Sequence, residues 1–352
     1  GPTGPIDTTK QEFQGKSDQN LKLFIVDMKT GDLLRTIDTG VAKAFAGTLS
    51  TSWIDTDRTN QASNGYYSDD VVYIGYTKKA ADGTWTEGGV LRLQTKEDPN
   101  PANWALSTLL SGTGPITTSV TKLQDRKNKL LWVYFGTGRY FYKQDDPSTT
   151  VQQKLYGVKE PCYSTADRGG RFPVSVLNVA GGSYNDMDPN CTDSVSSGLV
   201  NQSGDVSTAP AETLAATAAG WYITLDAANT SSLSERMITD PLASTAGAVF
   251  FTTFKPSSDV CQFGGQSLIW AVNYATGGVP PARSMEGKAL MQVSTGAFAE
   301  ISLKDAFDNP TNKRLHKRRI AVPIAGVPPT AQGLSLIVNP PPLKKFLHVR
   351  EK

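Results

Sequence analysis

The sequence predicts an all-β fold, a β-propeller of four-stranded antiparallel blades that lacks its first blades. Short runs rich in Val, Phe, Tyr and Trp alternate with Gly, Pro, Asn and Ser, which is the pattern of strands and turns. These runs recur in the same order along the chain, and a repeated four-stranded unit is the blade of a propeller. The 32 Gly and 21 Pro residues suit a protein with many turns.

The clearest repeat unit lies at 237–278 and contains the strand-like runs AVFFTTF and SLIWAVN. We expect a short polar first strand before them, with the pattern aliphatic, hydroxyl, small polar, then Ser or Pro. This pattern occurs three times, at 49–52, 116–119 and 238–241. Each copy precedes an apolar second strand, and these begin at Val72, Val133 and Val249. Third strands follow from Val90, Leu155 and Leu268.

The third-strand pattern also occurs near the start, where 24–31 matches 270–277 as aromatic-x-Val-Asp/Asn-x-x-Thr-Gly. Fourth strands are expected at 33–37, 104–110 and 220–225, and more strand material follows at 290–293, 320–324 and 334–338. The first blade therefore begins on its third strand, which would leave an unpaired edge and put apolar residues such as Phe24, Val26 and Trp53 in water. A β-sandwich whose strands happen to be similar is the alternative.

We expect three parts in the chain. Residues 1–20 form a flexible N-terminal segment. The propeller domain covers 21–340, with a surface insertion at about 161–219 that is rich in Ser, Ala, Gly, Asp and Thr. A basic, proline-led C-terminal tail follows at 341–352.

Composition and charge exclude few functions, but they narrow the choice between classes of protein. The formal net charge is +2 with 19% charged residues, so no global charge favours nucleic acid as a partner. No apolar run is long enough to span a membrane, and no signal peptide is evident at the N-terminus. There are three cysteines. A bridge between Cys162 and Cys191 would close the base of the insertion, with Cys261 left over; three separate thiols are the alternative.

Two loops have the oxygen-ligand spacing that Ca²⁺ needs. The first candidate consists of Asp55, Asp57, Thr59 and Asp70. The second consists of Asp186, Asp188, Asn190 and Asp193. Neither is a full EF-hand loop, and short Asp/Asn runs also form turns without binding metal.

Catalytic patterns are sparse, and we predict that the chain is not an enzyme. The two histidines, His316 and His348, leave little for a Ser-His-Asp arrangement or a histidine-rich metal centre. Gly136-Thr137-Gly138 fits a turn better than a phosphate cradle. The basic run 313–319 is expected to be a solvated face, with an anionic partner as the alternative.

Several motifs together resemble the C-terminal propeller of the PilC/PilY type IV pilus tip proteins. They cover much of 21–278, with the insertion unmatched, and lie at 23–31, 49–57, 70–75, 220–223, 235–238, 250–254 and 256–261. The resemblance implies a secreted, non-enzymatic protein at the pilus tip or outer-membrane surface of a bacterium. In that family such a protein supports pilus assembly and mediates adhesion.

The resemblance also implies a calcium loop and a set of partners. The family's loop falls on Asp55, Asp57 and Asp70, with Thr59 where a stronger ligand is usual, and the loop is longer here. The implied partners are minor pilins or the pilus tip and a host or surface receptor, and no nucleic acid. An N-terminal part of the same gene product would complete the propeller. The alternatives are a quinoprotein-like propeller dehydrogenase, against which the widely spaced cysteines argue, and a carbohydrate-binding propeller.

Overall fold

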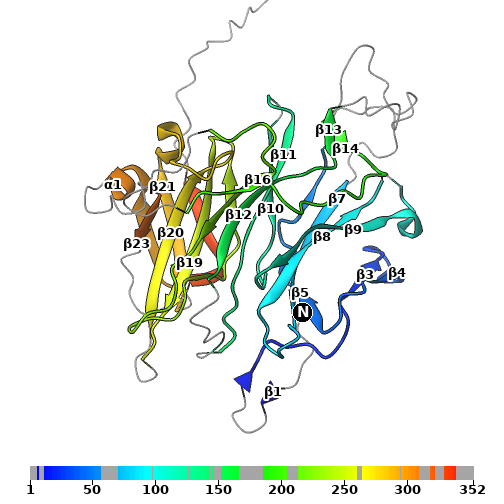
Figure 1. Ribbon diagram of the computed structural model, residues 1–352, viewed down its shortest axis with the longest axis horizontal. Helices are drawn as coiled ribbons and strands as arrows, with labels where there is room; N and C mark the ends of the chain where they lie inside the picture. The colour runs from blue at the N-terminus through cyan, green and yellow to red at the C-terminus, as the bar shows by residue number, and fades with distance from the viewer. Residues whose placement is uncertain are drawn as a thin grey trace, which may run out of the picture.

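The computed structural model describes the following residues: 6–7, 12–56, 70–96, 98–125, 127–142, 145, 152–165, 185–203, 213–259, 264–293, 295–308, 318–321 and 329–337. Within these ranges the chain forms a series of mainly antiparallel sheets, and the central strands of these sheets follow one another in sequence order. Figure 1 shows them side by side, from the β3–β4 hairpin on the right to the sheet that contains β21 on the left. No helix in the described ranges is long and apolar enough to cross a membrane.

The first of these sheets is a two-stranded hairpin of β3 (Lys22–Val26) and β4 (Leu33–Asp38). These are the positions predicted for the third and fourth strands of a blade whose first two strands are missing. In the described part of the chain, no further strand pairs with β3.

The three sheets that follow have five strands each. The first contains β5 (Ala44–Ala46), β6 (Trp53–Ile54), β7 (Val71–Lys78), β8 (Glu87–Gln94) and β9 (Ala105–Thr113). The short 3₁₀ helix η1 (Pro101–Asn103) leads into β9. Both β5 and β6 pair with β7, so the first strand of this blade is broken into two pieces.

The second five-stranded sheet lies in the middle of the series. It contains β10 (Thr121–Asp125), β11 (Leu130–Gly136), β12 (Lys154–Lys159), β16 (Gly220–Thr224) and β15 (Leu199–Asn201). Strand β15 comes from the predicted insertion and pairs in parallel with β16. The described part of the segment 161–219 therefore contributes a strand to the sheet.

The third five-stranded sheet holds the clearest repeat unit. It contains β17 (Arg236–Met237), β18 (Leu242–Ser244), β19 (Ala248–Pro256), β20 (Gly265–Asn273) and β23 (Arg319–Ala321). Again the first strand is in two pieces, since β17 and β18 both pair with β19.

The last sheet has three strands, and two short hairpins stand apart from the series. Its strands are β21 (Lys288–Val293), β22 (Phe298–Ser302) and β24 (Pro329–Ile337), accompanied by the 3₁₀ helix η2 (Ala282–Met285) and by α1 (Leu303–Asp308). The separate hairpins are β1 (Ile6–Asp7) with β2 (Glu12–Phe13), and β13 (Tyr163–Thr165) with β14 (Asn185–Met187).

Alternating residues on each central strand explain why the sheets stack. On β11, Val133 and Phe135 belong to one core cluster, while Trp132 and Tyr134 belong to the next. Strands β7 and β19 divide their side chains between two clusters in the same way. Because neighbouring side chains on a strand point to opposite faces, each sheet buries both faces against its neighbours. Each fully buried large apolar side chain contributes about 1.5–3 kcal/mol relative to exposure.

The recurring polar pattern is not itself a strand. The residues at 49–52 and 238–241 fall in the break between the two pieces of a first strand, and those at 116–119 precede β10. The prediction of first strands there was therefore wrong by a few residues. The pattern recurs because it forms the connection at which the three sheets meet.

Candidate functional site

The three copies of the recurring polar pattern come together in space. The Asp240 carboxylate accepts a hydrogen bond from Ser50 Oγ at 2.8 Å and another from the Ser119 N–H at 2.8 Å. Thr51 Oγ1 lies 2.9 Å from Ser119 Oγ. One residue or more from each repeat thus takes part in a shared hydrogen-bond network. This network ties three sheets together, and it accounts for the pattern without a ligand.

The first candidate calcium loop lies partly within the described residues. Ile54 on β6 pairs with Val71 on β7, which puts Asp55 and Asp70 at facing positions just beyond that pair. Asp70 is buried, and its Oδ2 accepts hydrogen bonds from the Thr56 N–H at 2.5 Å and from Thr56 Oγ1 at 2.6 Å. Asp57 and Thr59 lie outside the described residues. Two of the four predicted ligands are therefore brought to one end of β6 and β7.

The second candidate loop is arranged differently. Asp188 is buried, and its Oδ1 accepts a hydrogen bond from the Asn190 N–H at 3.0 Å, which is the local turn that Asp residues often form. Asp193 is exposed, and Asp186 lies on β14. Within the described ranges, no three acidic, His or Cys side chains are grouped so as to hold a metal ion.

A buried polar network lies next to this second loop. Arg92 on β8 and Glu160 after β12 form an ion pair of 3.4 Å, and both side chains have no exposed surface. Glu160 also accepts hydrogen bonds from Tyr73 Oη and from the Cys162 N–H, each at 2.8 Å. Burial raises the pKa of Glu160, although Arg92 acts in the opposite direction. Burial and the charge of Glu160 also raise the pKa of Tyr73.

The disulfide between Cys162 and Cys191 completes this network. The two Cα atoms are 5.5 Å apart and both side chains are buried. Arg92 Nη1 donates to Cys162 Sγ at 2.7 Å, and the Arg92 guanidinium also donates to the carbonyl oxygen of Asp193. The bridge therefore fixes the described part of the insertion onto the first two five-stranded sheets. Cys261 lies outside the described residues.

Removing the bridge should lower stability. We expect the double variant Cys162→Ser/Cys191→Ser to lose about 3–4 kcal/mol of unfolding free energy, because the bridge closes a loop between residues 29 positions apart. Urea unfolding measures the loss, and Cys261→Ser is the matched control, expected to change it little. If both thiols were alkylated in the urea-unfolded protein without prior reduction, the bridge would be excluded.

The glycines at 136 and 138 serve packing between sheets. A Cβ on Gly136 would lie 2.2 Å from Met237 Sδ, and one on Gly138 would lie 2.6 Å from Arg236 Cβ. Gly138 also has a φ of +145°. Only glycine fits such a close approach. The expected turn is not what the structure has here: Gly136 ends β11 and Gly138 bridges to Ile116. Close packing against Arg236 and Met237 explains both glycines.

The end of the basic run is buried, which corrects the expectation of a solvated face for those residues. Arg318 is fully buried and donates to the carbonyl oxygens of Gln202 and Gly277 at 2.9 and 2.8 Å. Burial lowers the pKa of Arg318 to about 10. Arg319 pairs with the buried Glu235 at 2.6 Å and with Asp226 at 3.1 Å. Residues 313–317, with His316, lie outside the described ranges, as does His348.

Nearby cations lower the pKa of Asp226. Burial acts to raise the pKa of Asp226, but Arg319 and Lys255 outweigh it and hold that pKa below its usual value.

The buried ion pairs of Arg92 and Arg319 were missed from sequence, although one signal was available. A charged residue such as Arg92 within the apolar run Val90-Leu91-Arg92-Leu93 would be expensive to bury without a partner.

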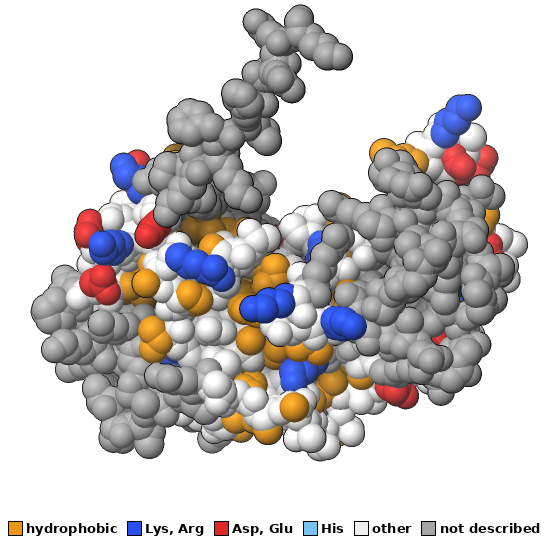
Figure 2. Space-filling view, turned by 90° about the horizontal axis from the view of Figure 1, so that it is seen from above, with side chains coloured by type: hydrophobic (Ala, Val, Ile, Leu, Met, Phe, Trp, Pro, Cys, Tyr) orange, Lys and Arg blue, Asp and Glu red, His pale blue; other side chains and the backbone are white. Residues whose placement is uncertain are grey.

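The outward face of the β3–β4 hairpin is the clearest candidate for an interaction surface. Phe24 is 64% exposed, Val26 is 50% exposed, and Leu33 and Leu34 of β4 are exposed as well. Phe24 and Val26 share one face of β3, and Val26 lies opposite Leu33. Exposed apolar residues that lie together mark contact surfaces. The charged side chains are more scattered: Figure 2 shows Lys and Arg side chains set singly among apolar and polar ones on the face seen from above.

The fold and the exposed hairpin together define the class of protein. The chain is a β-propeller whose first hairpin, β3–β4, exposes an apolar face. No protein-family model matches it. It is 25% identical over 322 residues to the type IV pilus biogenesis factor PilY1 of Pseudomonas aeruginosa (strain UCBPP-PA14), covering 83% of this chain and 27% of that protein. It is 24% identical over 184 residues to the PilY1 homolog of Xylella fastidiosa (strain Temecula1), covering 50% of this chain and 13% of that one.

Among solved structures, the chain is similar to the C-terminal domain of Pseudomonas aeruginosa PilY1. The TM-score is 0.53 at 16% identity, and the match covers 91% of this chain and 66% of that domain. The homologues of this chain are thus PilY1 type IV pilus biogenesis factors, and the predicted resemblance and propeller fold are confirmed. The chain spans about a quarter of the length of the first of these relatives.

Proposed function

We propose that this chain is the propeller module of a type IV pilus biogenesis factor. It acts on the outside of a bacterial cell, at the pilus tip or outer-membrane surface, as a non-enzymatic binding and assembly protein that also mediates adhesion. One observation carries the proposal: similarity to a pilus biogenesis factor extends over 83% of the chain. The β-propeller fold supports it, since the same fold occurs in the corresponding domain of that relative.

The uncovered face of the β3–β4 hairpin suggests how the module is placed. Strands from an earlier part of the same gene product would pair with β3 and cover Phe24 and Val26. Other surfaces of the propeller then remain for minor pilins and for a host or surface receptor. Because function depends on the site and not on the fold alone, these partners need direct tests.

Deletion of the segment that encodes this module, in the bacterium that carries it, tests the proposal. We expect far fewer surface pili, and recovery of the pili when the intact gene is restored. Co-purification of a tagged module with minor pilins tests the assembly role, and retention of the cells on a surface tests adhesion. Normal numbers of pili in the deletion strain would contradict the proposal.

Calcium is the cofactor that we propose for this module. Asp55 and Asp70 face one another at the end of β6 and β7, and Asp57 and Thr59 follow in the loop between them. Carboxylate oxygens suit Ca²⁺, but one oxygen of Asp70 already accepts two hydrogen bonds from Thr56. When bound, calcium would hold the two ends of this loop together.

Calcium should therefore raise the melting temperature. A ligand present at about 100 times its Kd and bound only to the folded state adds about 2.7 kcal/mol of stability. We expect Asp55→Ala or Asp57→Ala to abolish the rise, and Asp82→Ala, in an exposed turn elsewhere, to preserve it. Thermal unfolding with calcium and with a chelator measures the effect. If calcium did not change the melting temperature of the unmodified chain, the loop would not be a calcium site.

A further inference from the structure

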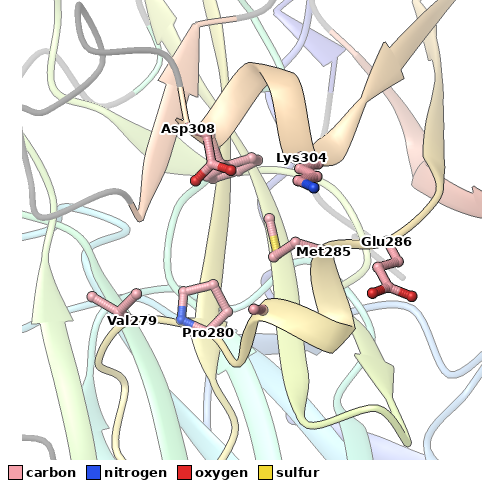
Figure 3. A pocket seen from close by; sticks show the side chains of 8 residues that line it. Val279, Pro280, Met285, Glu286, Lys304 and Asp308 are labelled. Carbon is pink, nitrogen blue, oxygen red and sulfur yellow. The ribbon is translucent and has the colours of Figure 1, made fainter.

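A pocket of about 260 Å³ lies beside the last sheet, between the 279–286 segment and α1. Its floor is apolar and includes Pro280, Met285 and Phe307, all of them buried. Figure 3 shows Met285 reaching up toward α1, with Lys304 and Asp308 above it and Glu286 at one side. Small-molecule sites usually have about 300–1,000 Å³, so this pocket suits one or two side chains of a peptide better.

Among the described residues, the charged side chains on the rim of the pocket have no ion-pair partner. These residues, Glu286, Lys304 and Asp308, are exposed. Asp308 is also the last residue of α1, where the helix dipole disfavours an acid and favours a nearby cation. The rim carries two acids and one lysine, so an apolar floor with this rim fits a segment that combines an apolar side chain with lysines directed at the two acids.

Such a segment begins close by in this chain. Lys288 on β21 pairs with Ile337, the last residue of β24, so the chain leaves β24 two residues from Glu286. The sequence that follows contains Pro340-Pro341-Pro342, then Leu343-Lys344-Lys345-Phe346. Phe346 lies nine positions after Ile337, a reach of about 30 Å when the chain is extended. Prolines restrict the free chain, which lowers the entropy cost of ordering it.

We propose that the C-terminal tail, residues 341–352, binds this pocket of its own chain. Phe346 occupies the apolar floor, and Lys344 and Lys345 lie against Glu286 and Asp308. An aromatic side chain buries more apolar area than any other residue of the tail. This contact is independent of the pilus function proposed above.

A synthetic peptide of residues 338–352 tests this in the full chain. A tail tethered by a short linker competes at a millimolar effective concentration. We therefore expect labelled peptide to bind the Phe346→Asp chain at least about tenfold more tightly than the unmodified chain. Because Phe346 lies in the tail, the substitution leaves the sheets intact, and unchanged thermal unfolding checks this.

Charge reversal then locates the contact. Glu286→Lys and Asp308→Lys together, in the Phe346→Asp chain, should weaken peptide binding about tenfold, and a peptide with Lys344→Glu and Lys345→Glu should restore it. Glu300→Lys, an acid exposed on β22, is the matched control and should have no effect. Equal binding to the two chains, no binding to either, or tail exchange that yields dimers as concentration rises would overturn the proposal.

Discussion

Replacing Arg92 by Met should lower the free energy of unfolding by about 3–5 kcal/mol. The substitution leaves Glu160 buried without its cation, and breaking a buried ion pair from one side costs about this much. It also removes the hydrogen bonds that the guanidinium donates to Cys162 Sγ and to the Asp193 carbonyl. Urea unfolding followed by fluorescence measures the change.

A double-mutant cycle separates charge from packing. In Arg92→Met/Glu160→Gln, no uncompensated charge remains, so we expect the loss to be smaller than the sum of the single losses. Lys78→Met is the matched control, because Lys78 pairs with Glu87 at 3.0 Å on the same sheet but near the surface. That variant should lose less than about 1 kcal/mol. Strictly additive single losses would show that Arg92 and Glu160 are not coupled.

The sheets could be predicted from sequence because their cause is local. Runs such as Val71–Lys78 and Ala248–Pro256 are apolar on both faces and bounded by turn residues. A strand of that composition is stable only between two neighbouring sheets, and its recurrence indicates a series of them. The orphan match at 24–31 likewise located the β3–β4 hairpin.

What could not be predicted depends on contacts between distant residues. Arg92 and Glu160 meet across two sheets, and Ser50 reaches Asp240 over 190 positions of sequence. Nothing in the local pattern pairs them. The recurring polar pattern was accordingly assigned to strands, although its side chains bond between sheets. The sequence suggests a surface for the basic run for the same reason, because the partners of Arg319 are far away in sequence. Asp226 follows β16 and Glu235 precedes β17.

The candidate site was predicted unevenly. The cysteine pair was proposed because it flanks the insertion, and the structure brings Cys162 and Cys191 together. The spacing of Asp186 to Asp193 suggested a cation loop, but the backbone turns so that Asp188 bonds to Asn190 and the Asp193 carbonyl bonds to Arg92. Spacing alone does not fix which way an oxygen points.

Expressed by itself, the chain should self-associate through the β3–β4 hairpin. Strand β3 offers an unpaired edge in the described structure, and its outward face exposes Phe24 and Val26. Exposed edges of this kind pair with other chains. Each apolar side chain that such contact buries contributes about 1.5–3 kcal/mol. We therefore expect Phe24→Lys to weaken association at least about tenfold, since 1.4 kcal/mol corresponds to a factor of ten.

The other end of the series of sheets supplies the control. Phe298 on β22 is 65% exposed, nearly the same as Phe24 at 64%. Two residues further along β22, Glu300 lies opposite Leu290 of β21 and forms an ion pair with Lys288. A charged pair on that face disfavours apolar contact, so Phe298→Lys should leave association unchanged. Sedimentation velocity over a hundredfold range of concentration measures both variants. A monomer at every concentration would mean that β3 is covered within the chain itself, and an equal effect of the two substitutions would mean that the hairpin is not the contact.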